Sequence, residues 1–292
     1  MNTLSVSPPT LERRFFFRGH AIGIAGHITY PQDEMILARG CSAVPAIGGR
    51  AESDEEAWEN DFVQVQSIST KASGDFVERE PLRLSYDRVS VENLVPETRT
   101  EVEIQGLTIA DRVSVDLMKG GMESTGVLFP LQSPIRPFDI CITGVKIDNY
   151  PLRVVLATQV FANNDTYAKL ERAYDDSAAF RARYGKLFFS PDGPLSDKLP
   201  ESHGVVYCTM VDELAWEGTP HPNATIVGNS VVIPDYGVVY FAEMLISRQY
   251  RRFIMLRARL GSSVGGDARL GSSFGGHVVA MDVETNGTYW PF

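Results

Sequence analysis

Three histidines that each follow a glycine are the residues whose type and setting most directly suggest chemistry. They are His20, His27 and His277, which end the tripeptides Arg-Gly-His, Ala-Gly-His and Gly-Gly-His. If the segments 15–30 and 277–283 pair as neighbouring strands, the imidazoles approach one another, and three imidazoles suit zinc or another borderline metal. However, His20 and His27 are seven residues apart, so an unbroken strand points them to opposite faces. We therefore expect histidines that mark strand ends, and the sequence assigns no metal ligand.

No common catalytic or nucleotide-binding motif occurs in the sequence in the structural setting that it needs. It has no Gly-x-x-x-x-Gly-Lys-Ser/Thr loop and no Gly-x-Gly-x-x-Gly loop that opens a helix. Gly261-Ser-Ser-Val-Gly265 and Gly271-Ser-Ser-Phe-Gly275 match Gly-x-Ser-x-Gly as a string, but they lie in a duplicated hairpin and not on the strand-to-helix turn that a nucleophile elbow needs. Adjacent carboxylates such as Asp175-Asp176 and Glu55-Glu56 fall in a predicted surface helix or loop, whereas a glycosidase needs two carboxylates that converge across a cleft. The sequence therefore assigns no catalytic residue, no cofactor-binding residue and no cofactor.

Aromatic side chains offer a second kind of site, a surface on which sugars stack. The candidates are Trp58, Trp216, Trp290, Tyr236, Tyr240 and Tyr289. Aromatic residues at this density more often fill a core. We therefore expect most of them to be buried.

The overall charge excludes one class of partner. The chain of 292 residues has a formal net charge of -10, and phosphate binding needs an excess or a cluster of Lys and Arg. We therefore expect no nucleic-acid partner.

Two charge clusters nevertheless stand out along the chain. Residues 248–269, the arginine segment, carry Arg248, Arg251, Arg252, Arg257, Arg259 and Arg269. Residues 52–61, the acidic segment, carry Glu52, Asp54, Glu55, Glu56, Glu59 and Asp61. The two segments are either solvated faces or complementary surfaces, within one subunit or between neighbours.

Cysteine usage and hydropathy bear on the cellular compartment. Cys41, Cys141 and Cys208 are odd in number and far apart, so no disulfide framework is implied. The first residues contain no apolar signal core, and no stretch approaches eighteen uninterrupted apolar residues. We expect a soluble cytoplasmic protein without a membrane partner.

The elements that must position these side chains are mostly strands, because apolar residues alternate with a period of two. In the segment 252–260, alternation places Ile254, Leu256, Ala258 and Leu260 on one face and Phe253, Met255, Arg257 and Arg259 on the other. The segment 238–246 alternates as well, and we expect the two to pair as a hairpin. The pattern predicts an all-β fold, a sandwich or distorted barrel of antiparallel hairpins.

Two repeats support this fold class. The block 258–267 is followed by a near copy at 268–277, each with a Gly-Ser-Ser-x-Gly-Gly turn. We interpret the second copy as an insertion in a surface loop, because removing 258–267 restores a single hairpin. A weaker repeat aligns residues 102–111 with residues 140–149, at an offset of 38. It is either chance similarity of two hairpins or a common hairpin with a mid-strand glycine, where a bulge or a close backbone crossing is expected.

One segment breaks the strand pattern. Residues 163–185 begin with Asn, Asp and Thr capping candidates and end with Arg and Gly, which predicts a helix or two short helices. We expect Tyr167, Leu170, Tyr174 and Ala178 to pack on the sheet. The Pro- and Gly-rich residues 190–200 follow and offer a boundary. One β-rich domain over residues 1–292 is favoured, and the alternative is a β half at 1–162, a helical insert with its loop at 163–200 and a second β half at 201–292.

These observations favour a non-catalytic structural or binding protein, with a second copy of itself as the candidate partner through sheet edges and the two charge clusters. The enzyme hypothesis stays open as a hydrolase that uses carboxylates or a histidine-bound metal. A carbohydrate or small-ligand binding module is the third hypothesis.

Overall fold

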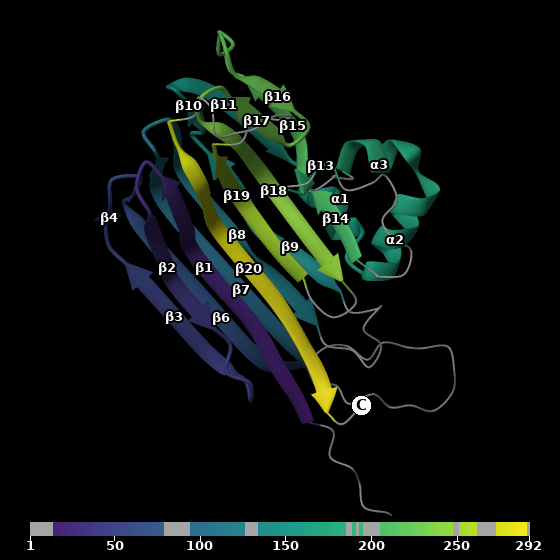
Figure 1. Ribbon diagram of the computed structural model, residues 1–292. Coiled ribbons are helices and arrows are strands. Elements are labelled where there is room, and N and C mark those ends of the chain that lie inside the picture. Colours follow the sequence, from purple (N-terminus) through teal and green to yellow (C-terminus); the bar gives the residue numbers. More distant parts are fainter. Residues whose placement is uncertain are drawn as a thin grey trace, which may run out of the picture.

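The structure is a computed structural model (Figure 1) and describes residues 14–78, 94–125, 134–184, 189–190, 193–194, 205–247, 251–261 and 273–290. Two large antiparallel sheets and a small group of helices make up the fold. The all-β prediction with a small helical insertion is therefore confirmed. Among the described residues, no helix combines the length and apolar character that a membrane crossing requires.

Sheet A contains strands from both ends of the chain. Its order is β16-β17-β18-β19-β20-β1-β2, and β14 also pairs with β18. These strands are β1 (Arg14–Tyr30), β2 (Glu34–Ala43), β14 (Val205–Thr209), β16 (Thr225–Val227), β17 (Ser230–Ile233), β18 (Gly237–Ser247), β19 (Arg251–Leu260) and β20 (Gly275–Trp290).

Sheet B is built from the middle of the chain. Its order is β15-β11-β10-β8-β7-β5-β4, with β9 paired to β8, β6 to β7 and β3 to β6. These strands are β3 (Gly49–Glu55), β4 (Trp58–Glu59), β5 (Val63–Val65), β6 (Ser67–Glu78), β7 (Leu94–Ile109), β8 (Val113–Thr125), β9 (Ile135–Thr143), β10 (Lys146–Ile147), β11 (Tyr150–Leu156) and β15 (Val211–Trp216). A separate short pair consists of β12 (Phe189–Ser190) and β13 (Gly193–Pro194).

Both strand pairings predicted from the sequence are present. β18 pairs with β19 in antiparallel register, and β1 pairs with β20 from Arg14 opposite Trp290 to Tyr30 opposite Gly275. β19 and β20 also pair, with Leu260 opposite Gly276, as the single-hairpin interpretation of the duplicated block requires. Residues 262–272 of that block, together with Arg248 and most of 190–200, lie outside the described residues.

A row of irregular residues, here called the crease, crosses five strands of sheet A. Its members are Gly40, Gly23, Met281, Met255 and Ala242, on β2, β1, β20, β19 and β18, each lying between residues that pair in register. The backbone angle φ is positive on alternate strands of this row, at 56° in Gly40, 54° in Met281 and 50° in Ala242. Such angles interrupt the extended backbone, and the inward-facing side chains shift by one position on crossing the crease.

The crease overturns two predictions that assumed unbroken alternation. Phe253 is fully buried on the same side as Leu256 and Ala258, whereas Ile254 is only partly buried. The predicted faces of the segment 252–260 are therefore wrong at its beginning, because the phase changes at Met255.

The same shift applies to strand β1. Ala21 and Ile24 lie on either side of Gly23, and both are fully buried although they are three residues apart. Two residues of β1 that lie on opposite sides of Gly23 therefore share a face when an odd number of positions separates them. His20 and His27 therefore lie on the same outward face of sheet A, and not on opposite faces as predicted.

Sheet B contains a comparable irregularity, and it explains the weaker repeat. Gly106 and Gly144, aligned at the offset of 38, have positive φ angles of 62° and 66°. Each copy then ends in a turn with two successive positive angles, at Ala110-Asp111 and Asp148-Asn149. Gly106 lies within β7, whereas Gly144 lies between β9 and β10, so both glycines interrupt the extended backbone but only Gly106 lies inside a strand.

Two glycines of the crease allow the sheets to approach closely. A Cβ atom at Gly23 would lie 2.2 Å from Cγ2 of Ile68 on β6, and a Cβ atom at Gly40 would lie 2.2 Å from the same atom. Ile68 is itself buried, with 1% of its surface exposed. The side chain of Ile68 therefore occupies the space that two missing Cβ atoms leave in sheet A.

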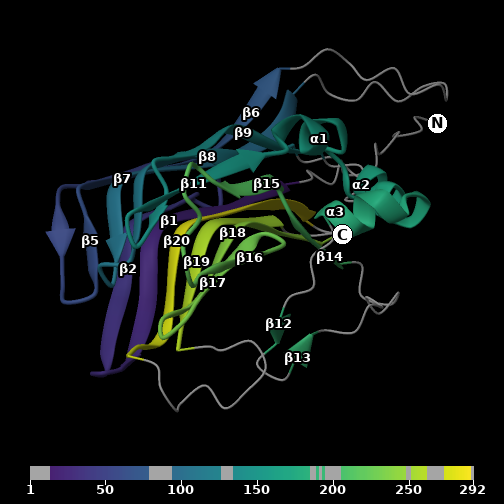
Figure 2. The same ribbon diagram turned by 90° about the horizontal axis from the view of Figure 1, so that it is seen from above.

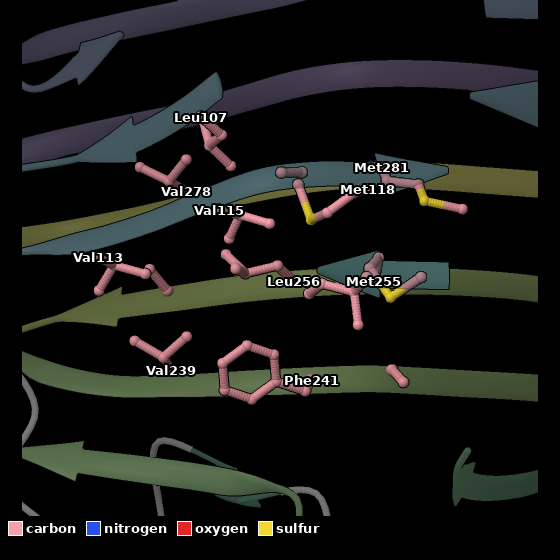
Figure 3. Close-up of a cluster of buried hydrophobic side chains, with 14 of the residues drawn as sticks. Leu107, Val113, Val115, Met118, Val239, Phe241, Met255, Leu256, Val278 and Met281 are labelled. Carbon is pink, nitrogen blue, oxygen red and sulfur yellow. The ribbon is translucent and has the colours of Figure 1, made fainter. Parts of the chain in front are cut away.

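The main core fills the space between the two layers, which Figure 2 shows with β6 to β9 on one side and β1 and β16 to β20 on the other. Figure 3 shows buried side chains from both sheets facing each other in this core. Sheet B contributes Leu107, Val113, Val115 and Met118, and sheet A contributes Val239, Phe241, Met255, Leu256, Val278 and Met281.

The helical insertion begins earlier than the sequence predicts. Its helices are α1 (Thr158–Asn163), α2 (Tyr167–Asp176) and α3 (Ala178–Tyr184). Strand β11 ends at Leu156 and α1 follows at Thr158, five residues before the start of the predicted helical segment at 163. The side chain of Thr166 caps α2 by accepting a hydrogen bond from the backbone N–H of Lys169 at 3.2 Å.

The predicted packing face of this segment is partly correct. Leu170 is fully buried and Tyr174 packs against the core, but Ala178 is exposed. The helical phase does not continue from Tyr174 to Ala178, because α2 ends at Asp176 and α3 starts anew after Ser177. The side chain of Tyr167 lies outside the described residues.

Candidate functional site

The three histidines do not form one site, but two of them are direct neighbours. His27 on β1 lies opposite His277 on β20 in the sheet register, whereas His20 lies opposite Glu284. At about 3.3 Å per residue, His20 is about 23 Å along β1 from His27. Within the described part of the chain, no three or more His, Cys, Asp or Glu side chains come together as metal ligands. The three imidazoles therefore do not converge, and the three-histidine site considered from the sequence does not form among the described residues.

The His27–His277 pair has a charged environment. Nε2 of His27 lies 2.5 Å from Oδ1 of Asp33, in the turn after β1. His277 lies opposite Arg259 of β19 on its other side. Desolvation by its neighbours, followed by the charges of His27 and Arg257, lowers the pKa of His277. The imidazole of His277 is therefore held toward its neutral form near pH 7.

The arginine segment binds carboxylates of its own sheet. Arg257 makes two hydrogen bonds to Glu243, at 2.7 and 2.8 Å, and Arg252 makes a two-pronged contact with Asp282. Glu243 and Asp282 are almost fully buried, with 3% and 4% of their surface exposed. Burial acts against the charge of Arg257, but the hydrogen bonds and charge of Glu243 raise its pKa overall. These ion pairs satisfy charges that would otherwise be costly to bury.

The acidic segment is attached to a different part of the chain. Glu55 accepts a hydrogen bond from the backbone N–H of Gly40 at 2.6 Å and pairs with Arg39 at 3.3 Å. Asn60 donates a hydrogen bond to Glu34. Residues 55–60 are thereby held against β2, and Arg39, rather than Arg252 or Arg257, is the partner of Glu55 within the subunit.

A third polar cluster joins the ends of both sheets and was not found from the sequence. Arg112, in the turn between β7 and β8, makes a two-pronged contact with Asp148, in the turn between β10 and β11. The Nη1 group of Arg112 also donates to the carbonyl oxygen of Pro234, at 3.0 Å. His221 contacts the same carboxylate, with 2.9 Å between its Nε2 and Oδ2 of Asp148.

The hydrogen bonds of His221 decide which tautomer it adopts. Its Nδ1 accepts the backbone N–H groups of Asn223 at 3.1 Å and Ala224 at 2.8 Å, so the proton resides on Nε2 and is donated to Asp148. The ring is almost fully buried and stacks on Trp216, with a centroid distance of 5.7 Å. With both nitrogens occupied, His221 lacks the free lone pair that a general base needs, and this arrangement is suited to joining the turns.

The cluster also sets the charge state of Asp148. The hydrogen bonds from Arg112 lower the pKa of Asp148 and outweigh desolvation, which acts in the opposite direction, and the bond from His221 adds to the lowering. Asp148 is therefore an anion throughout the neutral range, and it holds Arg112 and His221 together by charge-assisted bonds. The sequence contained one signal, because Asp148 is the penultimate residue of the second copy, 140–149, of the repeat whose copies are offset by 38 residues.

The aromatic candidates whose side chains the structure describes do not form a common surface. Tyr236 and Tyr240 are buried, with 0% and 3% of their surface exposed, which confirms the core interpretation for these two. Trp58 lies beneath the guanidinium of Arg39 at 4.5 Å, and Trp216 packs on His221. The side chains of Tyr289 and Trp290 lie outside the described residues.

Large apolar side chains are exposed together at one edge of sheet A. Tyr30, Met35 and Leu37, here called the edge patch, have 55%, 60% and 74% of their surface exposed. Met35 and Leu37 flank the buried Ile36 on β2, so both point away from the core. Met35 lies opposite His27, which makes the edge patch continuous with the His27–His277 pair.

Comparison with known proteins places this architecture in a family. A family model described as a domain of unknown function, DUF8256, matches residues 15–188 and 192–247. The chain belongs to the DUF8256 family. The match begins in β1 and ends in β18, so it includes the turns that carry Arg112, Asp148 and His221 and the whole edge patch of this DUF8256 domain. No curated protein and no solved structure matches the chain.

Proposed function

We propose that this DUF8256 domain is a non-catalytic structural protein that associates with a second copy of itself through the edge patch on the outer face of sheet A. The observation that carries this proposal is the exposure of Met35 and Leu37 on the outward side of β2, with Tyr30 exposed at the end of the neighbouring strand β1. Single exposed apolar residues are common on soluble proteins, but contiguous ones mark contact surfaces. A symmetric contact needs one self-complementary surface on each copy.

The charges on either side of the edge patch support a second copy as the occupant. Arg259, His277 and His27 form a row across β19, β20 and β1 that leads to Met35. Beyond β2 lies the acidic segment, held there by the contact between Glu55 and Arg39 (Figure 1). Its exposed carboxylates are those of Glu52, Asp54, Glu56, Glu59 and Asp61. A two-fold axis through the edge patch brings Arg259 of one copy toward the acidic segment of the other, which favours association.

The edge strand β2 of sheet A is a poor site for adding a further strand, which favours contact through the face of the sheet instead. Glu55 occupies the backbone N–H of Gly40, and an occupied edge group discourages the addition of another strand. The proposed contact therefore uses the side chains of Met35 and Leu37 and not the backbone of β2.

Light scattering coupled to size exclusion at two salt concentrations tests the proposal. We expect a particle of twice the mass of one chain, with a dissociation constant that rises as salt screens the charged rims. Leu37→Asp places a charge at the centre of the contact and should yield monomers. Val227→Asp is the matched control, because Val227 is 45% exposed on β16 at the opposite edge of sheet A. Monomers of the unmodified chain at high concentration and low salt would refute the proposal.

A further inference from the structure

The His27–His277 pair has the geometry of a two-ligand chelate. The two residues are directly opposite on neighbouring antiparallel strands, where Cβ atoms are about 4.5–5.5 Å apart. His277 is exposed and the side chain of His27 is 34% exposed, so both rings are accessible from solvent. Two imidazoles at this separation can bind one ion between them.

Asp33 supplies the second element of such a site. Its carboxylate lies 2.5 Å from Nε2 of His27, and a proton held on Nε2 leaves the lone pair on Nδ1. Metal-binding histidines commonly donate their other N–H group to a carboxylate, which orients the ring and makes the ligating nitrogen more basic.

We propose that His27 and His277 bind one borderline divalent cation, such as Zn²⁺ or Ni²⁺, with Asp33 as a positioning residue. Imidazole nitrogen is a preferred ligand of these ions. No third ligand of the usual types joins the pair within the described residues, so water completes the coordination. Arg257 and Arg259 on β19 face the pair, and their charge lowers the affinity for a cation.

Calorimetric titration of the full chain with Zn²⁺ or Ni²⁺ alone, at pH 7.5 and pH 5.5, tests the proposal. We expect one ion per chain at pH 7.5 and weaker binding at pH 5.5, because protons compete for the imidazoles. His277→Gln and His27→Gln should each weaken binding by at least about tenfold, and Asp33→Asn by about tenfold. Arg259→Gln removes a nearby positive charge and should strengthen binding.

His20→Gln is the control, because His20 lies on the same face of β1 but far from the pair. It should bind the metal as tightly as the unmodified chain. Thermal unfolding of each variant without metal verifies that it is folded. Equal affinity of His277→Gln and the unmodified chain, or no binding by the unmodified chain, would overturn the proposal. Either result would leave the proposed self-association untouched, because the mass of the particle is measured in the absence of metal.

Discussion

Replacing Gly23 with alanine tests the reasoning that glycines in the crease allow Ile68 to pack against sheet A. The added Cβ atom would lie 2.2 Å from Cγ2 of Ile68 and 3.0 Å from the carbonyl oxygen of Arg39. Ile68 is buried between the sheets and the carbonyl of Arg39 belongs to the backbone of β2, so neither neighbour can swing away. Overpacking of this kind costs about 1–3 kcal/mol, so we expect Gly23→Ala to lower the free energy of unfolding by about 2 kcal/mol.

Two further glycines separate the steric cost from the backbone cost. Gly106 has a φ of 62°, and its added Cβ atom would meet only the side chain of Gln66, which is exposed and can move. Gly106→Ala should therefore cost about 1 kcal/mol from the left-handed backbone alone. Gly40 combines a φ of 56° with the same 2.2 Å contact to Ile68, and Gly40→Ala should cost about 3 kcal/mol.

Urea unfolding of the three variants gives these free energies. A double variant adds a sharper test, because Ile68→Ala removes the atom that the new methyl group meets. Alone it should cost about 2–5 kcal/mol. Combined with Gly23→Ala, the total should fall short of the sum by at least about 1 kcal/mol. Additive costs, or a Gly23→Ala variant no less stable than Gly106→Ala, would refute the close approach.

Three further predictions concern charge and the duplicated block. Asp148→Asn should destabilise the protein by about 1–2 kcal/mol at pH 7. Because Arg112 lowers the pKa of Asp148 in the folded state, this difference should shrink as the pH falls below about 4 and the unmodified carboxylate is protonated, which urea unfolding across pH measures. The pKa of His277 is also lowered by folding, so its contribution to stability is intact above about pH 6.5 and declines below it; a His277→Gln variant whose stability depends equally on pH would contradict this. Excision of residues 258–267 should change stability by no more than about 1 kcal/mol, because residues 268–270 repeat the Ala-Arg-Leu end of β19, and loss of folding in circular dichroism would show the interpretation to be wrong.

The sequence predicted those parts of the fold that depend on local pattern. Alternation located β18 and β19, and capping residues located α2. The pairing of β1 with β20 was considered as well, since both segments alternate. In each case the signal lies within a few neighbouring residues.

The parts that failed depend on contacts between distant residues. Ala242 and Met281 adopt positive φ angles although neither is a glycine, so the sequence does not indicate them. The crease depends on pairing across five strands and not on local residue type. The contact of Asp148 with Arg112 spans 36 residues and its contact with His221 spans 73. No local motif encodes either contact.

Self cross-linking measures the proposed association most directly. A symmetric contact places the same residue of both copies near the two-fold axis, so a Leu37→Cys variant should form a disulfide-linked dimer under mild oxidation. A Cys41→Ser background removes the exposed thiol on the same strand, and Val227→Cys in that background serves as the control. We predict rapid dimer formation by Leu37→Cys and little by Val227→Cys. Equal rates for the two variants would contradict the assignment of the edge patch as the contact surface.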